Sequence, residues 1–282
     1  MKILLVGGNS SLAIALKPLL AKFAQVVTAG RSGCDMLLEL GDPTRDISFP
    51  SGFDFVVNTS VHFGGSSVED FIAAQEVNVL GLLNLCRACT QATITHLVQV
   101  SSIFAVLESG SPFYSIYSLS KKHADEVAQL YATRFGLSLL TIRPAQLYGV
   151  GEAYRKNQPF LYSIMDKAQE NQDIIFYGSN DALRNFIHVE DVAMAITLAI
   201  QHKLVGNYDC AYPENFRYSE IASAAISAFS SNSHVSFDHT KPDIPDNAFA
   251  SDNLLYQAIG YSPRISIIDG MQMEAAHRRM HI

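Results

Sequence analysis

Short apolar runs alternate with helix-like segments from the first residues of the chain. Continuous apolar runs of this length are typical of strands that are buried on both faces of a sheet. They predict strands at Lys2–Val6, Gln25–Ala29, Phe53–Asn58, His96–Ser101 and Leu137–Ile142. Between several of them, apolar positions recur at helical spacing, which predicts helices at about Leu12–Phe23, Val68–Thr90 and Ser115–Phe135. Strands that alternate with helices indicate a parallel sheet.

The rhythm loosens after Arg143 and Pro144. Aromatic and glycine-containing stretches follow, with expected helices at about Asn157–Gln169 and Glu190–His202 and a short strand at Asp173–Tyr177. A length of 282 residues suits one α/β body with a smaller lobe. We therefore expect a doubly wound parallel sheet of the Rossmann type in residues 1–150, with segments near 178–210 returning to it. Residues 151–282 would form mainly a smaller C-terminal substrate-binding lobe.

Composition and charge exclude several classes of function. Apolar residues make up 48% of the chain and charged residues 17%, as in globular proteins. The net charge is -7 and no Lys/Arg run could follow a phosphate backbone, so a nucleic-acid partner is not expected. No apolar run has the length of a membrane span or of a signal peptide core, so we expect no membrane partner.

The four cysteines form no disulfide framework in a chain this long, which fits a reducing compartment and a cytoplasmic protein. Cys86 and Cys89 make a C-x-x-C inside a helix-like stretch, and no second pair completes a zinc site. We expect them to serve packing, and we expect no metal site.

The first turn of the chain has the composition of a phosphate-binding loop. It lies directly between the first expected strand and the first expected helix, and it reads Gly7, Gly8, Asn9, Ser10, Ser11, Leu12 and Ala13. A dinucleotide pyrophosphate needs this context, because free N–H groups and the positive end of a helix must approach it closely. Alanine at the last position still lets helix and strand pack, and the Ser10 hydroxyl can donate a hydrogen bond. Gly7, Ser10, Ser11, Leu12 and Ala13 are therefore candidate cofactor residues, with an ordinary tight turn as the alternative.

The end of the second strand lacks the carboxylate that would bind the ribose of NAD. Arg31 and Ser32 stand there instead. Because a guanidinium matches the geometry of a phosphate, they favour the 2′-phosphate of NADP; a surface arginine in a loop is the alternative. Asp42, followed by Pro43, is a candidate contact for the adenine ring or part of a simple turn.

Three residues suggest proton transfer at a ketone or an alcohol. Tyr117 and Lys121 form a Y-x-x-x-K at i, i+4 on an expected helix, so they share one face. Ser102 follows the strand His96–Ser101, at the carboxyl edge where α/β sheets bind ligands. A phenol donates or accepts a proton near neutral pH if a neighbouring ammonium lowers its pKa. We expect Tyr117 to be the acid, Lys121 to lower the pKa of Tyr117, and Ser102 to hold the same substrate oxygen.

With these motifs the chain resembles the extended short-chain dehydrogenase/reductase family, in its nucleotide-sugar epimerase, dehydratase and reductase branch. The resemblance runs from Lys2 to about Leu204. It is carried by the glycine turn and by six further segments, namely Gly41–Asp42, Val77–Gly81, Val100–Ser102, Tyr117–Lys121, Arg143–Gly149 and Arg184–Asp191.

The resemblance implies roles for further residues. Ser102, Tyr117 and Lys121 would be catalytic, and Lys121 would also reach the nicotinamide ribose. The residues that would surround the cofactor or brace its site are Thr59, Ser60, Asn78 and Pro144. Gln146 and Arg184 would face the diphosphate of the substrate, with a structural salt bridge as the alternative for Arg184. Ile103 and Phe104 stand where sugar-nucleotide dehydratases carry an acidic pair, which disfavours dehydration.

These expectations leave several functions open. The first is NADPH-dependent reduction of a 4-keto nucleotide sugar, with Tyr117 as the general acid. An NAD-dependent nucleotide-sugar 4-epimerase that retains its cofactor is the second, and a non-catalytic NADP-binding sensor or scaffold is the third. Flavonoid-like or steroid ketones are other possible substrates, and they would not need Arg184. By analogy with the family, a homodimer would form through the helices Val68–Thr90 and Ser115–Phe135.

Overall fold

The structure of the chain is a computed structural model that describes residues 1–42, 46–250 and 252–281. It divides into two compact units, which are treated separately below. Unit 1 comprises residues 1–144, 193–210 and 254–260, and unit 2 comprises residues 145–192, 211–253 and 261–282. The sequence led us to expect that the first unit ends near residue 150 and that segments near 178–210 return to it. In the structure, the chain leaves unit 1 at Pro144, and the segments that return to it are 193–210 and 254–260. The segment 178–192 carries short strands that pair inside unit 2, which sequence periodicity does not reveal.

Unit 1 is built on a parallel sheet of seven strands in the order β11-β6-β5-β4-β1-β2-β3. The strands are β1 (Lys2–Val6), β2 (Gln25–Gly30), β3 (Met36–Leu37), β4 (Phe55–Asn58), β5 (His96–Val100), β6 (Ser138–Pro144) and β11 (Gly206–Cys210). The order reverses at β1, where β2 and β4 lie on opposite sides of it. This is the doubly wound topology of Rossmann-type folds, so the predicted fold class is confirmed.

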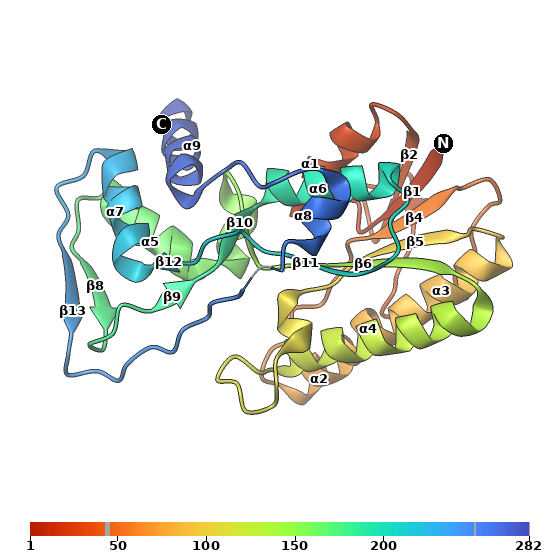
Figure 1. Ribbon diagram of the computed structural model, residues 1–282, viewed down its shortest axis with the longest axis horizontal. Coiled ribbons are helices and arrows are strands. Elements are labelled where there is room, and N and C mark those ends of the chain that lie inside the picture. The colour runs from red at the N-terminus through yellow and green to blue at the C-terminus, as the bar shows by residue number, and fades with distance from the viewer. Residues whose placement is uncertain (43–45, 251, 282) are drawn as a thin grey trace. The chain divides into compact units, whose positions relative to one another are not determined.

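Helices cover both faces of this sheet (Figure 1). One face carries α2 (Val68–Gln75), α3 (Gly81–Gln91) and α4 (Ile116–Phe135), and the other carries α1 (Ser11–Leu20), α6 (Val189–Gln201) and α8 (Leu254–Ile259). The stretch expected as one helix over Val68–Thr90 contains a π-helical turn, η1 (Glu76–Leu80), between α2 and α3. Such turns are frequent at functional sites because they redirect side chains.

Local sequence sets the ends of α4. Ser115 and Ser118 form a reciprocal capping box at its start, and Gly136 ends it in the left-handed conformation at φ 72°. The alanines on its inner face are buried between the sheet and α3, together with leucines of the strands (Leu4, Leu97, Leu139, Ala124, Ala128). Small side chains allow the close approach of α4 to the sheet, and this approach brings Lys121 to the end of β5.

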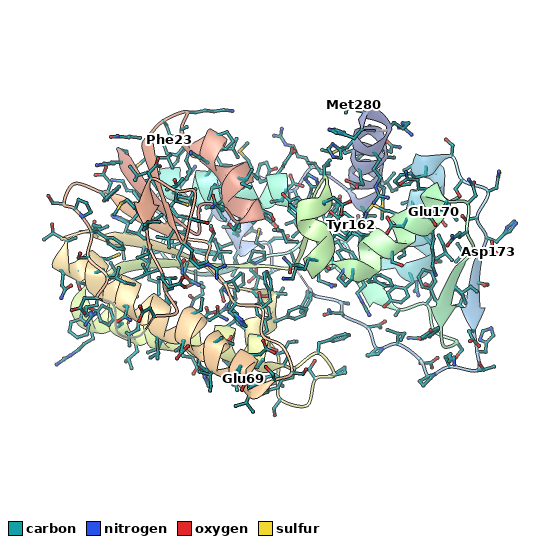
Figure 2. All side chains as sticks on the ribbon, turned by 180° about the vertical axis from the view of Figure 1, so that it is seen from behind. Phe23, Glu69, Tyr162, Glu170, Asp173 and Met280 are labelled. Carbon is teal, nitrogen blue, oxygen red and sulfur yellow. The ribbon has the colours of Figure 1, made fainter. Side chains whose placement is uncertain are left out.

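Unit 2 has its own core. Its elements are β7 (Gln146–Tyr148), η3 (Glu152–Asn157), α5 (Pro159–Gln169), β8 (Ile174–Tyr177), β9 (Leu183–Arg184), β10 (Phe186–His188), β12 (Phe216–Arg217), α7 (Tyr218–Phe229), β13 (Val235–Asp238) and α9 (Ile267–Met280). Its strands form three separate two-stranded sheets, which pair β7 with β10, β9 with β12 and β8 with β13. Tyr162 of α5 lies inside this core (Figure 2) and is fully buried. Among the described residues, no helix is both long and apolar enough to cross a membrane.

Candidate active site

The first turn of unit 1 leaves no room for side chains at its glycines. Gly7 has φ +76°, and a Cβ there would lie 2.8 Å from the backbone nitrogen of Ser60 and from the Oγ1 of Thr59. A Cβ on Gly8 would lie 2.8 Å from the Cβ of Thr28. Only glycine fits this close approach of β1, β2 and β4. The turn therefore presents bare backbone at the start of α1, as a bound pyrophosphate requires.

Ser10 is the N-cap of α1, which explains why serine is tolerated there. Its Oγ accepts a hydrogen bond from the Ala13 nitrogen at 3.1 Å and lies 2.8 Å from the Oγ1 of Thr59. The Thr59 hydroxyl donates to the carbonyls of Val6 and Gly7, so Ser10 is the donor to Thr59. Ser10 and Thr59 therefore brace the turn, while Ser11, Leu12 and Ala13 form the first turn of the helix.

The loop after β2 places Arg31 on the surface. It is tied to the glycine turn by Asn9, whose side-chain amide donates to the Ser32 carbonyl at 2.5 Å. The carboxylate of this loop, Asp35, accepts from both the nitrogen and the hydroxyl of Thr28, each at 2.8 Å, and these hydrogen bonds lower the pKa of Asp35. Asp35 is thus engaged inside the loop, and Arg31 is its exposed basic side chain. Asp42 is half-buried, and Pro43 lies outside the described residues.

Asn78 lies in η1 and holds the segment that follows β4. Its Oδ1 accepts from the His62 nitrogen at 2.8 Å, and its Nδ2 donates to the His62 carbonyl at 2.8 Å and to the Ser120 hydroxyl at 2.9 Å. Asn78 therefore connects the loop that begins with Thr59 and Ser60 to the helix that carries Tyr117. Through these hydrogen bonds, Asn78 braces the loop after β4 against α4.

Ser102 and Tyr117 meet at the carboxyl edge of the sheet. Ser102 follows β5 as the N-cap of the short helix η2 (Ile103–Val106), and its hydroxyl accepts from the Phe104 nitrogen at 3.2 Å. Burial raises the pKa of Tyr117 to about 12, and a hydrogen bond from Ser102 opposes this rise. The direction is opposite to our sequence-based expectation of a lowered pKa, because burial outweighs the favourable contacts. The chain by itself holds Tyr117 as a neutral phenol that can donate a proton.

Lys121 lies one helical turn beyond Tyr117 and is 1% exposed. Its ammonium donates to the Val100 carbonyl at 3.0 Å. Burial lowers the pKa of Lys121 to about 8, and the negative charge of Asp125 opposes this effect. Asp125 in turn accepts from the Nε of Arg143 at 2.8 Å. Arg143 and Asp125 were not among the predicted catalytic residues, although the i, i+4 spacing of Lys121 and Asp125 was visible in the sequence.

The face of Tyr117 is enclosed by aromatic rings. The Phe63 ring stacks on it with 5.6 Å between ring centres, and Phe104 meets it edge-on at 6.4 Å. Ile103 is buried. The position after Ser102 therefore adds apolar surface beside the phenol and no carboxylate.

Gln146 and Arg184, the predicted diphosphate contacts, belong to unit 2, which begins directly after Pro144. The Oε1 of Gln146 lies 3.5 Å from the Nδ2 of Asn247. Arg184 is buried, and its guanidinium donates to the carbonyls of Leu183 and Pro245 and to the Tyr218 hydroxyl. These contacts fit a structural role for Arg184, and its contact with a diphosphate stays a prediction.

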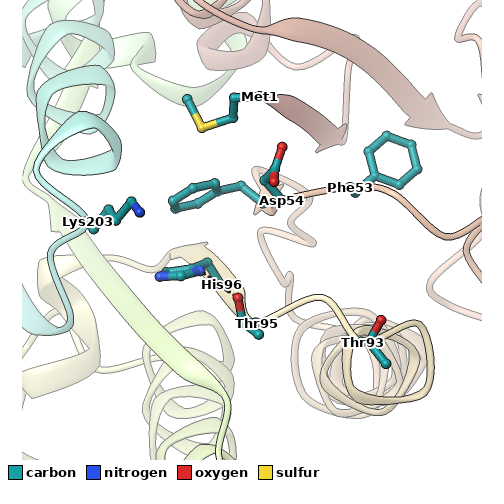
Figure 3. Close-up of a pocket in the computed structure, with 8 residues that line it drawn as sticks. Met1, Phe53, Asp54, Thr93, Thr95, His96 and Lys203 are labelled. Carbon is teal, nitrogen blue, oxygen red and sulfur yellow. Dashed lines mark hydrogen bonds between the residues drawn. The ribbon is translucent and has the colours of Figure 1, made fainter.

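An open depression of about 460 Å³ lies elsewhere in unit 1, beside the amino ends of β4 and β5 (Figure 3). Phe55, His96 and Lys203 are among the residues that line it. It is at the opposite edge of the sheet from Ser102, and none of the predicted site residues lines it. Across residues 1–42, 46–250 and 252–281, no group of three or more His, Cys, Asp or Glu residues could hold a metal ion.

The sequence profile of the NAD dependent epimerase/dehydratase family matches residues 27–211. Among curated proteins, the chain is 29% identical over 150 residues to the "Putative UDP-glucose 4-epimerase" of Methanocaldococcus jannaschii, covering 49% of this chain and 48% of the relative. It is 23% identical over 165 residues to the CDP-abequose synthase of Salmonella typhimurium, covering 58% and 54%. The chain thus spans about half the length of the curated relatives it matches.

Solved structures share the fold along the whole chain. The UDP-glucose 4-epimerase of Thermus thermophilus, in complex with NAD, superposes with a TM-score of 0.75 at 22% identity and full coverage of both chains. RMD from Pseudomonas aeruginosa, complexed with NADPH, gives a TM-score of 0.77 at 19% identity, again with full coverage of both. These likenesses confirm the fold, and the family match confirms the family that the sequence motifs indicated. The chain belongs to the NAD dependent epimerase/dehydratase family.

Proposed function

We propose that this protein is an NADPH-dependent reductase that acts on the 4-keto group of a nucleotide sugar. The observation that carries the proposal is the placement of Tyr117 near Ser102 at the carboxyl edge of the sheet, with Phe63 and Phe104 around the phenol ring and Lys121 one turn further along α4. Ketone reduction needs a proton donor at the substrate oxygen, and a phenol whose pKa lies near 12 is fully protonated at neutral pH. Tyr117 can therefore supply the proton that ketone reduction needs.

The cofactor preference rests on the loop after β2. The bare turn at Gly7 and the start of α1 fit the pyrophosphate of a dinucleotide. The Oδ2 of Asp35 accepts two hydrogen bonds from Thr28, which hold this carboxylate against β2. Arg31 is exposed and able to pair with a 2′-phosphate. This combination favours NADPH over NADH.

In the proposed reaction, the nicotinamide supplies a hydride to the carbonyl carbon when the cofactor is bound. Tyr117 donates its phenolic proton to the carbonyl oxygen, which becomes the hydroxyl of the product. Ser102 donates a hydrogen bond to the same oxygen and orients it toward Tyr117. Lys121, held by the Val100 carbonyl, stabilises the phenolate that forms until Tyr117 regains a proton from solvent. The apolar residues Ile103 and Phe104 provide no acid or base for eliminating water.

Cofactor preference is tested by calorimetric titration with NADP and NAD. Loss of a charge-assisted contact to the 2′-phosphate costs about 1.5–3 kcal/mol, so Arg31→Ala should weaken NADP binding by roughly tenfold to a hundredfold and leave NAD binding unchanged. Lys22→Ala, an exposed cation beyond the end of α1, is the matched control. Equal binding of NAD and NADP by the parent would remove the case for Arg31.

Turnover is tested with a panel of dTDP-, CDP-, GDP- and UDP-linked 4-keto-6-deoxyhexoses, followed by the loss of NADPH absorbance. Tyr117→Phe should bind NADP normally and lose turnover by several orders of magnitude. Normal turnover of Tyr117→Phe would refute the mechanism. The likeness to a "Putative UDP-glucose 4-epimerase" favours 4-epimerisation as the second candidate. An epimerase would interconvert UDP-glucose and UDP-galactose with NAD that stays bound during purification.

We also propose a homodimer that forms through α2 and α4. Both helices expose large apolar side chains, Val68, Phe71 and Ile72 on α2 and Leu130 and Phe135 on α4. Exposed apolar clusters of this kind mark interaction surfaces. Phe71→Asp should therefore halve the molar mass measured by light scattering, whereas Leu37→Asp, at an exposed apolar position on β3, should not.

A further inference from the structure

A row of buried polar side chains lies on the α4-covered face of the sheet and has no role in the mechanism so far. Asn58 on β4, Gln99 on β5 and Thr141 on β6 are adjacent across the sheet in register. Each is at most 2% exposed. Buried amides in a leucine-rich layer are costly unless they are hydrogen-bonded, so their contacts indicate why they are there.

The orientation of both amides follows from a single backbone donor. The Ser60 nitrogen donates to the Oδ1 of Asn58 at 3.0 Å, so the other end of Asn58 is the Nδ2 donor. That Nδ2 donates to the Oε1 of Gln99 at 2.8 Å. The remaining end of Gln99 is then its Nε2, which donates to the Val100 carbonyl at 3.0 Å. The whole chain of hydrogen bonds therefore has one direction, from Ser60 to Val100.

The Val100 carbonyl is also the acceptor for Lys121. The Nε2 of Gln99 and the Nζ of Lys121 are each 3.0 Å from this oxygen, so they are at most about 6 Å apart. Two donors share the two lone pairs of one carbonyl. Gln99 thereby occupies one lone pair and leaves the other for the lysine, while Asn58 prevents Gln99 from turning away.

We infer that Gln99, held by Asn58, is a positioning residue for Lys121 and acts on it through the Val100 carbonyl. The inference rests on the proposed role of Lys121 in reduction. It also connects that lysine to Ser60, which lies against the Gly7 turn. Nothing in the family motifs marks Gln99 or Asn58 for this role. In the sequence, Asn58 is visible only as the last residue of an apolar strand and Gln99 only as a polar residue inside one.

Other groups around Lys121 must be separated from this effect. Tyr117 and Asp125 flank it on α4, and Arg143 on β6 pairs with Asp125. The turn η1 carries Glu76, and η2 carries no charged residue. Gln99 differs from Asp125, Arg143 and Glu76 because it is neutral, and it differs from Tyr117 because its amide dipole points its positive end at the shared oxygen. Removing that dipole should favour the ammonium form of Lys121.

The first test is a titration of Lys121 by NMR, in protein that carries lysine labelled at the ε-carbon. The signal is assigned by its absence in Lys121→Met. Burial sets the parent pKa of Lys121 at about 8, and Gln99→Met should raise the midpoint by about half a unit to one unit, the equivalent of one neutral hydrogen bond. Thr141→Val is the matched control, because Thr141 is equally buried in the same row and its hydroxyl has no hydrogen-bond partner among the described residues. An unchanged midpoint in Gln99→Met overturns the inference.

The second test is a double-mutant cycle on turnover of the 4-keto sugar that the parent accepts. Gln99→Met should lower kcat by about tenfold or more with little change in KM, and it should have no further effect in a Lys121→Met background. Additive losses would mean that Gln99 acts independently of Lys121, which contradicts the inference. If Gln99→Met does not fold, the pair Asn58→Leu with Gln99→Met removes both side-chain amides together, and the only group that loses its partner is the Ser60 nitrogen, at a half-buried residue.

The two proposals fail in distinguishable ways. If Tyr117→Phe and Lys121→Met retain full turnover, the proposed function is wrong. The titration midpoint of Lys121 then still tests whether Gln99 acts on Lys121. If both lose turnover while Gln99→Met behaves like the parent in both tests, only the role of Gln99 is wrong.

Discussion

Asp125→Asn is the substitution that most directly tests how the site is supported. Asp125 is 5% exposed and accepts from Arg143 at 2.8 Å. Asparagine has nearly the same shape, so the change removes a charge and leaves the packing of α4 intact. The guanidinium of Arg143 is then left with Asp209, whose Oδ1 is 3.9 Å from its Nη1.

The magnitude follows from burial. Removing one partner of a fully buried ion pair costs about 3–5 kcal/mol, because the other charge stays buried without compensation. The Arg143 side chain is 18% exposed and keeps a second carboxylate nearby, so we expect a cost below this range, about 2–3 kcal/mol. Asp125 also raises the pKa of Lys121 against the effect of burial. Its loss should lower that pKa below about 8 and increase the neutral fraction of Lys121 near neutral pH.

The assay is urea denaturation of Asp125→Asn and of Glu126→Gln, with the Lys121 midpoint measured on the same samples. Glu126 is the exposed neighbour on the same helix, and neutralising it should change the free energy of unfolding by no more than about 0.5 kcal/mol. If Asp125→Asn is equally mild and leaves the Lys121 midpoint unchanged, the buried pair does not support the lysine and the reasoning is wrong.

Three further results are expected. Gly7→Ala should lower the free energy of unfolding by about 1–3 kcal/mol, because φ at this position is +76° and the alanine Cβ would press on Ser60 and Thr59. Calorimetry should also show weakened dinucleotide binding by this variant. Normal stability and binding would contradict the close packing of this turn. In a thiol titration, half-exposed Cys34 should react in the native protein, and the three buried thiols should react only after unfolding (Cys86, Cys89, Cys210). Burial raises the pKa of Cys86 from 9.0 to about 12, so its contribution to the free energy of unfolding is full below pH 9 and is lost as the pH rises toward 12. Cys86→Ala should flatten this pH dependence in denaturation curves, and an unchanged slope would mean that the thiol ionises freely in the fold.

Sequence alone determined the parts of this protein that depend on local pattern. Five strands, the glycine turn and the pairing of Tyr117 with Lys121 on one helix all follow from spacing along the chain, because apolar periodicity and turn chemistry act over a few residues. The doubly wound topology also followed, since alternating strands and helices leave few other arrangements.

Only the tertiary structure decided what surrounds those residues. The hydrogen bond between Asn58 and Gln99 joins residues that are 41 positions apart, and spacing along the chain does not reveal which buried amides meet. The π-helical turn that places Asn78 interrupts a pattern that reads as one helix. The pKa of Tyr117 is raised, whereas the sequence led us to expect a lowered value, because desolvation is set by how elements pack together. Residue identity thus determined which groups can exchange a proton, and packing decided the direction in which their pKa values are shifted.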